Sequence, residues 1–215
     1  MAKSDQSIFI IDDDAAVRDS LGLLLGLKGY RTQAYACADD FLHTYQPSWA
    51  GCLLLDVRLP GMSGLELQAA LHERKITLPI VVITAHGDVP TVRSALRGGA
   101  VDFLEKPVDP DALLAAVRAA LDADAAKRDA AHNQEIAERN LAVLTARERQ
   151  VMELVAQGIH YREIAAKLGI SPRTVEVHKA RVMEKLGVKN VPELVRMVLG
   201  AAPPAHARRG KPVTE

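Results

Sequence analysis

Three consecutive acids, Asp12, Asp13 and Asp14, directly follow the short apolar run of residues 7–11. Carboxylates this close together repel one another unless a cation joins them. A cluster of oxygen ligands at the end of a buried strand is therefore typical of a site for a hard metal such as Mg²⁺. The alternative is a structural turn in which Asp14 caps the next helix. The triplet alone leaves both interpretations open.

Polar residues also follow the third, fourth and fifth predicted strands, in the form of Asp56, Thr84 and Lys106. Because a doubly wound parallel sheet binds ligands at the carboxyl ends of its strands, these side chains should meet the first two acids at one edge. In such a set one carboxylate can attack phosphorus while a hydroxyl and an ammonium group hold the phosphoryl oxygens. Asp56, which follows the middle strand, is the predicted nucleophile.

The elements that must position these residues alternate short apolar segments with helical segments. This pattern predicts an α/β fold with a doubly wound, five-stranded parallel sheet of the flavodoxin type. The central segments are apolar throughout, as expected for strands that helices cover on both faces. The expected strands are residues 7–11, 31–35, 51–55, 79–83 and 101–104. The expected helices are residues 15–28, 38–46, 63–74, about 90–98 and 110–121.

The charge of the 215-residue chain is unevenly distributed, although its net value is +0. Residues 1–140 hold 14 Lys and Arg against 20 Asp and Glu, which gives −6, whereas residues 141–215 hold 13 against 7, which gives +6. An acidic part joined to a basic part suggests metal or phosphate chemistry in the first and a polyanionic partner for the second. A charged face without a partner is the alternative.

Cys37 and Cys52 belong to no CxxC pattern and have no nearby histidine cluster, so we expect neither a zinc site nor a disulfide framework. No apolar run approaches the roughly 20 residues that span a bilayer. These features predict a soluble, cytoplasmic protein without a membrane partner.

The chain divides into a sheet domain over residues 6–122 and a small helical domain over residues 143–200. Residues 123–142 are rich in Ala and charge and contain no Gly or Pro, so we expect a helical linker, with a flexible linker as the alternative. The tail over residues 201–215 is predicted to be disordered.

The motifs IIDDD, LLLDVRLPGMSG, VVITAHGD and VDFLEKP resemble the receiver domain of bacterial two-component response regulators. The resemblance implies that Asp56 accepts a phosphoryl group from a sensor histidine kinase. It also implies that Mg²⁺ is held by Asp13, Asp56 and the backbone carbonyl of Arg58. Asp12 would then help through a water molecule.

Further positions follow from the same resemblance. It implies a cis Lys106–Pro107 bond, and a switch formed by Thr84 and the aromatic Phe103, where many members carry Tyr. Arg58 and His86 flank the pocket at positions that would tune dephosphorylation. The alternative for both is that they are solvated loop residues.

The helical domain contains a helix-turn-helix pattern. Thr145 and Glu148 have the spacing of a capping box, and a helix follows them. The next helix, residues 161–168, ends at a Gly169 turn, and Ser171 caps a helix over residues 172–186. A final helix is expected to start at Asn190.

On the helix over residues 172–186, Val175, Val182 and Leu186 should face the core. The outward side mixes small apolar and charged residues, as suits base edges and phosphates in a DNA major groove. An ordinary surface helix is the alternative. The predicted DNA-contacting residues are Arg173, Thr174, Glu176, Val177, Lys179, Ala180, Arg181 and Lys185.

The motifs LTARERQVMELVAQG, IAAKLGIS and SPRTVEVHKARVMEKLG resemble the four-helix LuxR-type DNA-binding module, in its FixJ branch. Together the two resemblances imply a transcriptional response regulator rather than an enzyme. Such a regulator forms a homodimer on promoter DNA when phosphorylated, and RNA polymerase is a further implied partner.

Two other functions compete with this one. A phosphatase with an aspartate nucleophile typically needs a DxDx[TV] loop, but Ala16 stands four residues after Asp12. A DNA-binding protein whose receiver is never phosphorylated is the second alternative, and the complete set of pocket residues argues against it.

Overall fold

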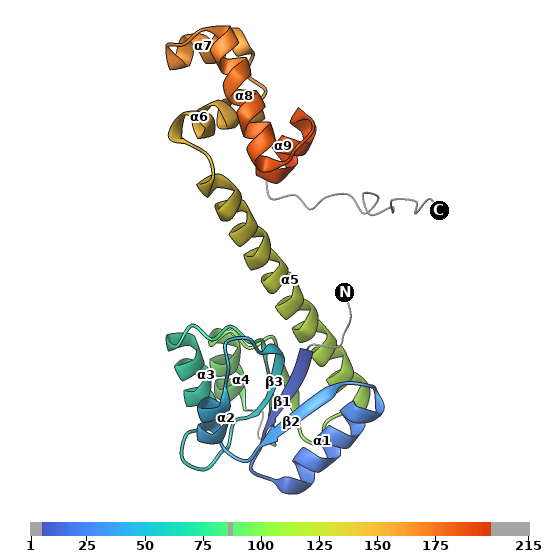
Figure 1. Ribbon diagram of the computed structural model, residues 1–215. Coiled ribbons are helices and arrows are strands. Elements are labelled where there is room, and N and C mark those ends of the chain that lie inside the picture. Colours follow the sequence, from blue (N-terminus) through green and yellow to red (C-terminus); the bar gives the residue numbers. More distant parts are fainter. Residues whose placement is uncertain (1–5, 86–87, 199–215) are drawn as a thin grey trace, which may run out of the picture. The chain divides into compact units, whose positions relative to one another are not determined.

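The computed structural model describes residues 6–85 and 88–198 of the chain (Figure 1). Contacts within the chain define two compact units, residues 1–128 and 129–215. His86 and the tail predicted to be disordered lie outside the described residues. In the part of the chain that the structure describes, none of the helices has the length and apolar character needed to cross a bilayer. Cys37 and Cys52 are both free thiols.

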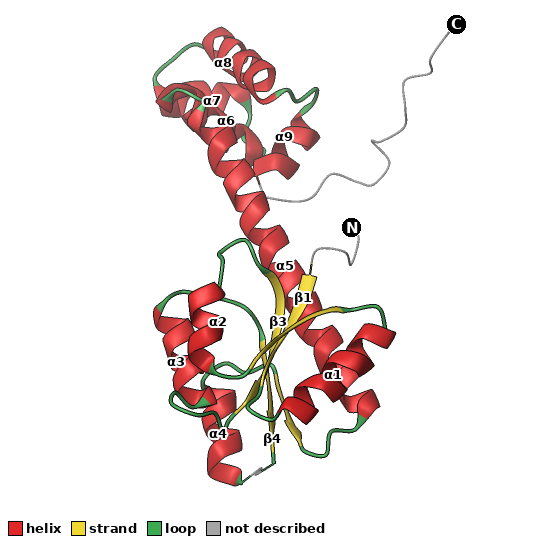
Figure 2. Ribbon diagram, turned by 60° about the horizontal axis from the view of Figure 1, so that its bottom comes forward, coloured by secondary structure: helices red, strands yellow, loops and turns green. Residues whose placement is uncertain are grey.

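The first unit is built on a five-stranded parallel sheet with the order β2-β1-β3-β4-β5. This order confirms the predicted doubly wound fold, and it brings the carboxyl ends of β1, β3, β4 and β5 to one edge (Figure 2). The strands span Gln6–Ile11 (β1), Arg31–Tyr35 (β2), Ala50–Asp56 (β3), Ile80–Thr84 (β4) and Asp102–Glu105 (β5).

Helices cover both faces of this sheet, which explains why its central strands are apolar throughout. Alternate residues of each strand point to opposite faces, so Ile8 and Ile10 pack against α1 and α5, whereas Phe9 and Ile11 pack against α2, α3 and α4. The helices span Ala15–Leu27 (α1), Ala38–Thr44 (α2), Gly64–Glu73 (α3), Val89–Arg97 (α4) and Pro110–Ala142 (α5).

Several predicted boundaries were off by one or two residues, and two of these lie near a proline. β4 starts at Ile80 rather than at Pro79, which has no N–H to donate to the ladder. α2 ends at Thr44 rather than at residue 46. Tyr45 has the extended ψ of 137°, so the helix ends before the position that Pro47 itself restricts, which is residue 46.

Within its described residues, the second unit contains four short helices around one apolar core. Val151, Ile164, Val175 and Leu194 each contribute a fully buried side chain to it. α7 and α8 form the predicted helix-turn-helix, joined through Gly169 with a left-handed φ of 65°. The helices span Ala146–Ala156 (α6), Tyr161–Leu168 (α7), Pro172–Leu186 (α8) and Val191–Val198 (α9).

Candidate functional site

The acids that follow β1 and end β3 lie together at the carboxyl edge of the sheet. One carboxylate oxygen from each of Asp12, Asp13 and Asp56 lies within 4.8 Å of the others. Asp12 and Asp56 are buried, whereas Asp13 is exposed. Three carboxylates at this spacing, one of them open to solvent, suit a hard divalent cation that keeps some of its water ligands.

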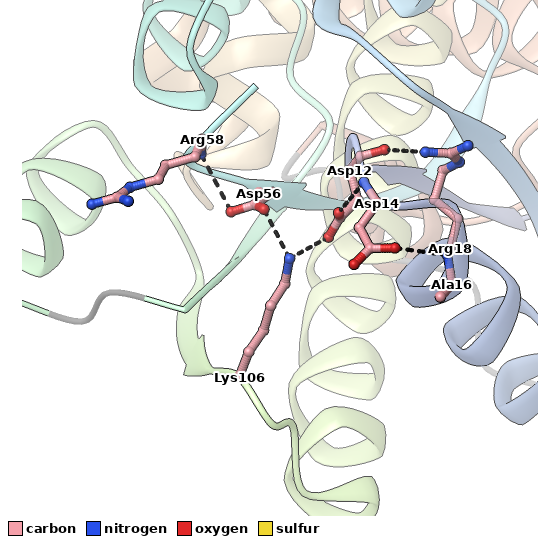
Figure 3. Close-up of polar contacts among 7 residues, drawn as sticks. All are labelled: Asp12, Asp14, Ala16, Arg18, Asp56, Arg58 and Lys106. Atoms are coloured by element: carbon pink, nitrogen blue, oxygen red, sulfur yellow. Dashed lines mark hydrogen bonds and ion pairs between the residues drawn. The ribbon is translucent and has the colours of Figure 1, made fainter. Parts of the chain in front are cut away.

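Lys106, which follows β5, bridges two of these acids (Figure 3). Its Nζ lies 2.6 Å from Asp12 Oδ2 and 2.8 Å from Asp56 Oδ2. Burial lowers the pKa of Lys106, but its hydrogen bonds to the two carboxylates outweigh this effect and raise the pKa above its usual value. Burial also raises the pKa of Asp12, against the opposing effect of the Lys106 hydrogen bond. The Lys106–Pro107 bond is cis, as the resemblance implied.

Asp14 has the structural role that the sequence left open for the acidic triplet. Asp14 caps α1, since its Oδ1 accepts a hydrogen bond from the Ala16 backbone N–H at 2.8 Å. The Asp14 backbone N–H in turn donates to Asp12 Oδ1 at 3.0 Å, and Arg18 Nη1 donates to the Asp12 carbonyl at 2.7 Å. The cap therefore also fixes the orientation of the buried Asp12 carboxylate.

Thr84 and Phe103 lie on the neighbouring strands β4 and β5. Thr84 is buried at the end of β4, and its carbonyl accepts the Lys106 backbone N–H at 2.9 Å. Phe103 is half-buried and packs on the apolar cluster beneath α4. The Arg58 backbone N–H donates to Asp56 Oδ1 at 3.3 Å, while its side chain points away from the carboxylates (Figure 3). We define the acid pocket as Asp12, Asp13, Asp56, Thr84 and Lys106.

The sequence did not identify one residue that positions Asp56. Gly64, the first residue of α3, packs so closely that a Cβ there would lie 2.1 Å from the Asp56 backbone carbonyl oxygen. Its N–H donates to the Val57 carbonyl at 2.9 Å. The motif LPGMSG indicates only a turn and the start of a helix. The close approach of Gly64 to the Asp56 backbone depends on how the chain folds.

In the second unit, α8 presents the face that its helical period predicted. Val175 and Val182 are fully buried, and Leu186 is half-buried against the same core. Val177 is 44% exposed on the outward side of α8. The other exposed residues predicted to contact DNA are Arg173, Glu176, Ala180, Arg181 and Lys185.

Both lysines among the predicted DNA contacts have partners within the unit. Lys179 Nζ donates to the Tyr161 hydroxyl at 2.7 Å and lies 5.2 Å from the centre of that ring. Lys185 Nζ lies 2.7 Å from Glu148 Oε2. The Glu148 side chain is only 4% exposed and also completes the capping box with Thr145. The hydrogen bond from Lys185, followed by that from the Thr145 backbone, lowers the pKa of Glu148 to about 2.

Family models match both units. A model described as the response regulator receiver domain matches residues 8–118. A model described as bacterial regulatory proteins of the LuxR family matches residues 142–198. These two matches cover the acid pocket and the helix-turn-helix, respectively.

Similar proteins share the whole arrangement. The transcriptional regulatory protein FixJ of Azorhizobium caulinodans is 47% identical over 199 residues, or 91% of this chain and 94% of that protein. The transcriptional regulatory protein TdiR of Thauera aromatica is 41% identical, over 90% of this chain and 85% of its own.

Solved structures agree with these similarities. The response regulator StyR matches with a TM-score of 0.81 and 41% identity, over 91% of this chain and 99% of its own. Full-length FixJ from B. japonicum matches with a TM-score of 0.58 and 43% identity, over 91% of this chain and 97% of its own. The chain therefore belongs to the FixJ-like two-component response regulators, transcriptional regulators that join a receiver domain to a LuxR-type DNA-binding domain and act in a phosphorylation-dependent manner.

Proposed function

We propose that Asp56 accepts the phosphoryl group from the phosphohistidine of a sensor kinase. A carboxylate oxygen of Asp56 attacks phosphorus, the P–N bond breaks as the P–O bond forms, and the imidazole of the kinase leaves. Lys106 and the Thr84 hydroxyl then hold phosphoryl oxygens. The observation that carries this proposal is the bridge from Lys106 to Asp12 and Asp56, which places a cation beside the nucleophile.

We further propose that the acid pocket binds Mg²⁺ through Asp13, Asp56 and the Arg58 backbone carbonyl, with Asp12 assisting through water. The donor set supports this assignment, because carboxylate and carbonyl oxygens are the ligands that Mg²⁺ prefers. Bound Mg²⁺ would screen the negative charge between the acids and the incoming phosphoryl group. Asp12 would keep Lys106 in place through their 2.6 Å contact.

Asp13→Ala is expected to weaken Mg²⁺ binding at least about tenfold, since it removes a direct oxygen ligand. Phosphorylation by a small phosphodonor should therefore need more Mg²⁺, and excess metal should restore part of the rate. Labelling measured across a Mg²⁺ titration provides the check. Asp19→Ala, which removes an exposed acid from α1, is the matched control. A metal requirement unchanged by Asp13→Ala would contradict the assignment.

On the DNA side, we propose that α8 lies in the major groove. Arg173, Thr174, Glu176, Val177 and Ala180 would face base edges, and Lys179 and Arg181 would face phosphates. The exposure of the Val177 side chain beside charged residues supports this orientation. We assign a structural role to Lys185 instead, because its Nζ already forms an ion pair with the buried Glu148 carboxylate.

Arg173→Ala and Val177→Ala are expected to cost about 1–3 kcal/mol each at the cognate site and to relax its sequence preference. Arg181→Ala should instead weaken cognate and random DNA alike and reduce the slope of log affinity against log salt by about 0.9. Binding isotherms on both DNAs at several salt concentrations separate these effects. Equal losses on both DNAs for all three variants would refute the orientation of α8.

We propose that phosphorylation drives homodimerisation, through a switch in which Thr84 and Phe103 change position together, so that two α8 helices meet two half-sites. We propose that the protein acts in the cytoplasm, where it would bind the kinase, the promoter and RNA polymerase. Size analysis with and without a phosphodonor and Mg²⁺, on wild type and Asp56→Asn, tests this directly. A mass change confined to phosphorylated wild type is expected, and no change in wild type would refute it.

A further inference from the structure

One buried acid lies outside the acid pocket. Asp124, on α5, is only 5% exposed, although every other residue of 122–142 is exposed or half-buried. It continues the buried stripe of Val117 and Leu121 by one further turn. The position lies beyond residue 118, where the match to the receiver family model ends.

Asp124 accepts hydrogen bonds from the starts of two neighbouring strands, β1 and β3. Its Oδ2 accepts hydrogen bonds from the Gly51 backbone N–H at 3.0 Å and from Gln6 Nε2 at 3.1 Å. Gln6 Nε2 also donates to the Leu121 carbonyl at 2.9 Å. Gln6 begins β1 and Ala50–Gly51 begin β3, so these contacts lie at the edge of the sheet opposite to the acid pocket, where α5 runs beside the strands (Figure 1).

The Gly51 backbone has a geometry that fits this contact and excludes a side chain. Its φ is +136°, and a Cβ there would lie 1.7 Å from the Ser7 carbonyl oxygen. One turn further along α5, Arg128 Nη1 donates to the Trp49 carbonyl at 3.2 Å. Trp49 stacks on Phe9 with ring centres 4.6 Å apart. The helix is thus attached to both the strand start and the loop before it.

Packing alone does not account for a carboxylate at this position. A leucine would continue the apolar stripe, whereas a buried carboxylate must be desolvated and requires hydrogen-bond donors. A carboxylate that accepts directional hydrogen bonds from one backbone N–H and one side-chain amide fixes the rotation and the axial position of its helix. Interchangeable apolar contacts do so less strictly.

We infer that Asp124 and Arg128 are positioning residues that fasten the first turns of the interdomain part of α5 to the receiver sheet. Through these two residues, a conformational change of the receiver on phosphorylation would shift the part of α5 that precedes the DNA-binding unit. The inference rests on the proposed function, because it concerns how phosphorylation at Asp56 reaches DNA binding. We call Gln6, Gly51, Trp49, Asp124 and Arg128 the helix anchor.

The test compares Asp124→Ala with Asp122→Ala in the full chain. Asp122 is an exposed acid on the same helix, so the two variants share their charge change. In Asp124→Ala, hydrogen exchange of backbone amides 122–128 should rise at least about tenfold, since local opening loses two bonds to a charged acceptor. Phosphorylation by a small phosphodonor should stay within about twofold of wild type, because the acid pocket is at the other edge.

The decisive measurement is the ratio of DNA affinities with and without the phosphodonor, because a purely structural role of Asp124 would leave this ratio unchanged. This ratio should fall at least about threefold in Asp124→Ala, while unphosphorylated binding and the Asp122→Ala control stay unchanged. An Asp124→Ala protein with wild-type exchange, or with the full wild-type ratio, overturns the inference. A wild type whose binding does not respond to the phosphodonor would instead refute the proposed function.

Arg128→Ala covers the case in which Asp124→Ala fails to fold. Arg128 is exposed, so its removal buries no unpaired charge. It should raise exchange over residues 125–129 at least about threefold and lower the affinity ratio in the same direction. An Arg128→Ala protein unchanged in both measurements overturns the inference, whatever the fate of Asp124→Ala.

Discussion

Asp56→Asn is expected to lower phosphoryl incorporation by more than about a thousandfold, because removing a nucleophile costs more than removing one stabilising donor. The amide keeps the shape of the side chain at the end of β3 but offers no anionic oxygen to attack phosphorus. It also removes one of the two carboxylates that Lys106 bridges and one of the three metal-site acids. Labelling with a radioactive small phosphodonor and Mg²⁺ measures the effect.

The control for Asp56→Asn is Asp19→Asn, which makes the same chemical change at an exposed position of α1. Thermal unfolding of both variants shows whether the receiver is still folded when its labelling is compared. Labelling of Asp56→Asn at the wild-type rate would refute the assignment of the nucleophile. Labelling that persists in Asp56→Asn but disappears in the double variant with Asp12→Asn would assign the attack to Asp12 instead.

The acid pocket could be predicted from the sequence because its geometry follows from topology. In a parallel sheet every strand delivers its carboxyl end to the same edge. The residues after four apolar segments were therefore expected to meet, although Asp12 and Lys106 are 94 positions apart. Shifts in strand boundaries did not harm this prediction. β4 ends at Thr84 rather than one residue earlier, and Thr84 still lies at the same edge.

The roles of Glu148, Lys185 and Asp124 could not be predicted, because each depends on a contact between elements. Helical period correctly placed Lys185 outside the core, and the capping box correctly placed Glu148 at the start of α6. Neither pattern says that α8 crosses α6 where these side chains meet. The role of Asp124 could not be predicted for the same reason. A single acid in a charged segment gives no sign in the sequence that it is buried.

Lys185→Ala is expected to destabilise the DNA-binding unit more than any exposed substitution on α8. The Glu148 carboxylate is 4% exposed, whereas the Lys185 side chain is 38% exposed. Removing the lysine leaves a buried negative charge without its cation, and an uncompensated buried charge strongly destabilises the folded state. The Tm of the unit should fall by at least about 5 °C, against little change for the exposed Lys189→Ala.

Glu148→Gln should be the milder substitution of the pair. The amide oxygen can still accept from the Thr145 backbone N–H, now 2.8 Å from Glu148 Oε2, and Lys185 can turn its ammonium group toward water. Equal losses of stability for Lys185→Ala and Glu148→Gln would show that the cost does not come from leaving the carboxylate charge unpaired. No loss in Lys185→Ala would show that the ion pair contributes nothing to the fold.

Acid should have the same effect as Glu148→Gln on the wild type. The pKa of Glu148 is lowered from 4.5 to about 2 by Lys185 and Thr145, so the folded unit binds this proton less readily than the unfolded chain. The stability that the carboxylate contributes is complete above about pH 4.5 and is lost as the pH falls toward 2. Unfolding of wild type should therefore depend more steeply on pH over this range than unfolding of Glu148→Gln.

DNA binding separates this structural role from a direct phosphate contact. If Lys185 stabilises the fold, Lys185→Ala should bind DNA with the wild-type salt dependence at temperatures where the unit is folded, and should lose binding when the unit unfolds. If Lys185 contacts a phosphate, the slope of log affinity against log salt should fall by about 0.9 at every temperature, as expected for Arg181→Ala. The short contact with Glu148 favours the first outcome, because an ammonium group already bonded to a carboxylate gains less from a phosphate.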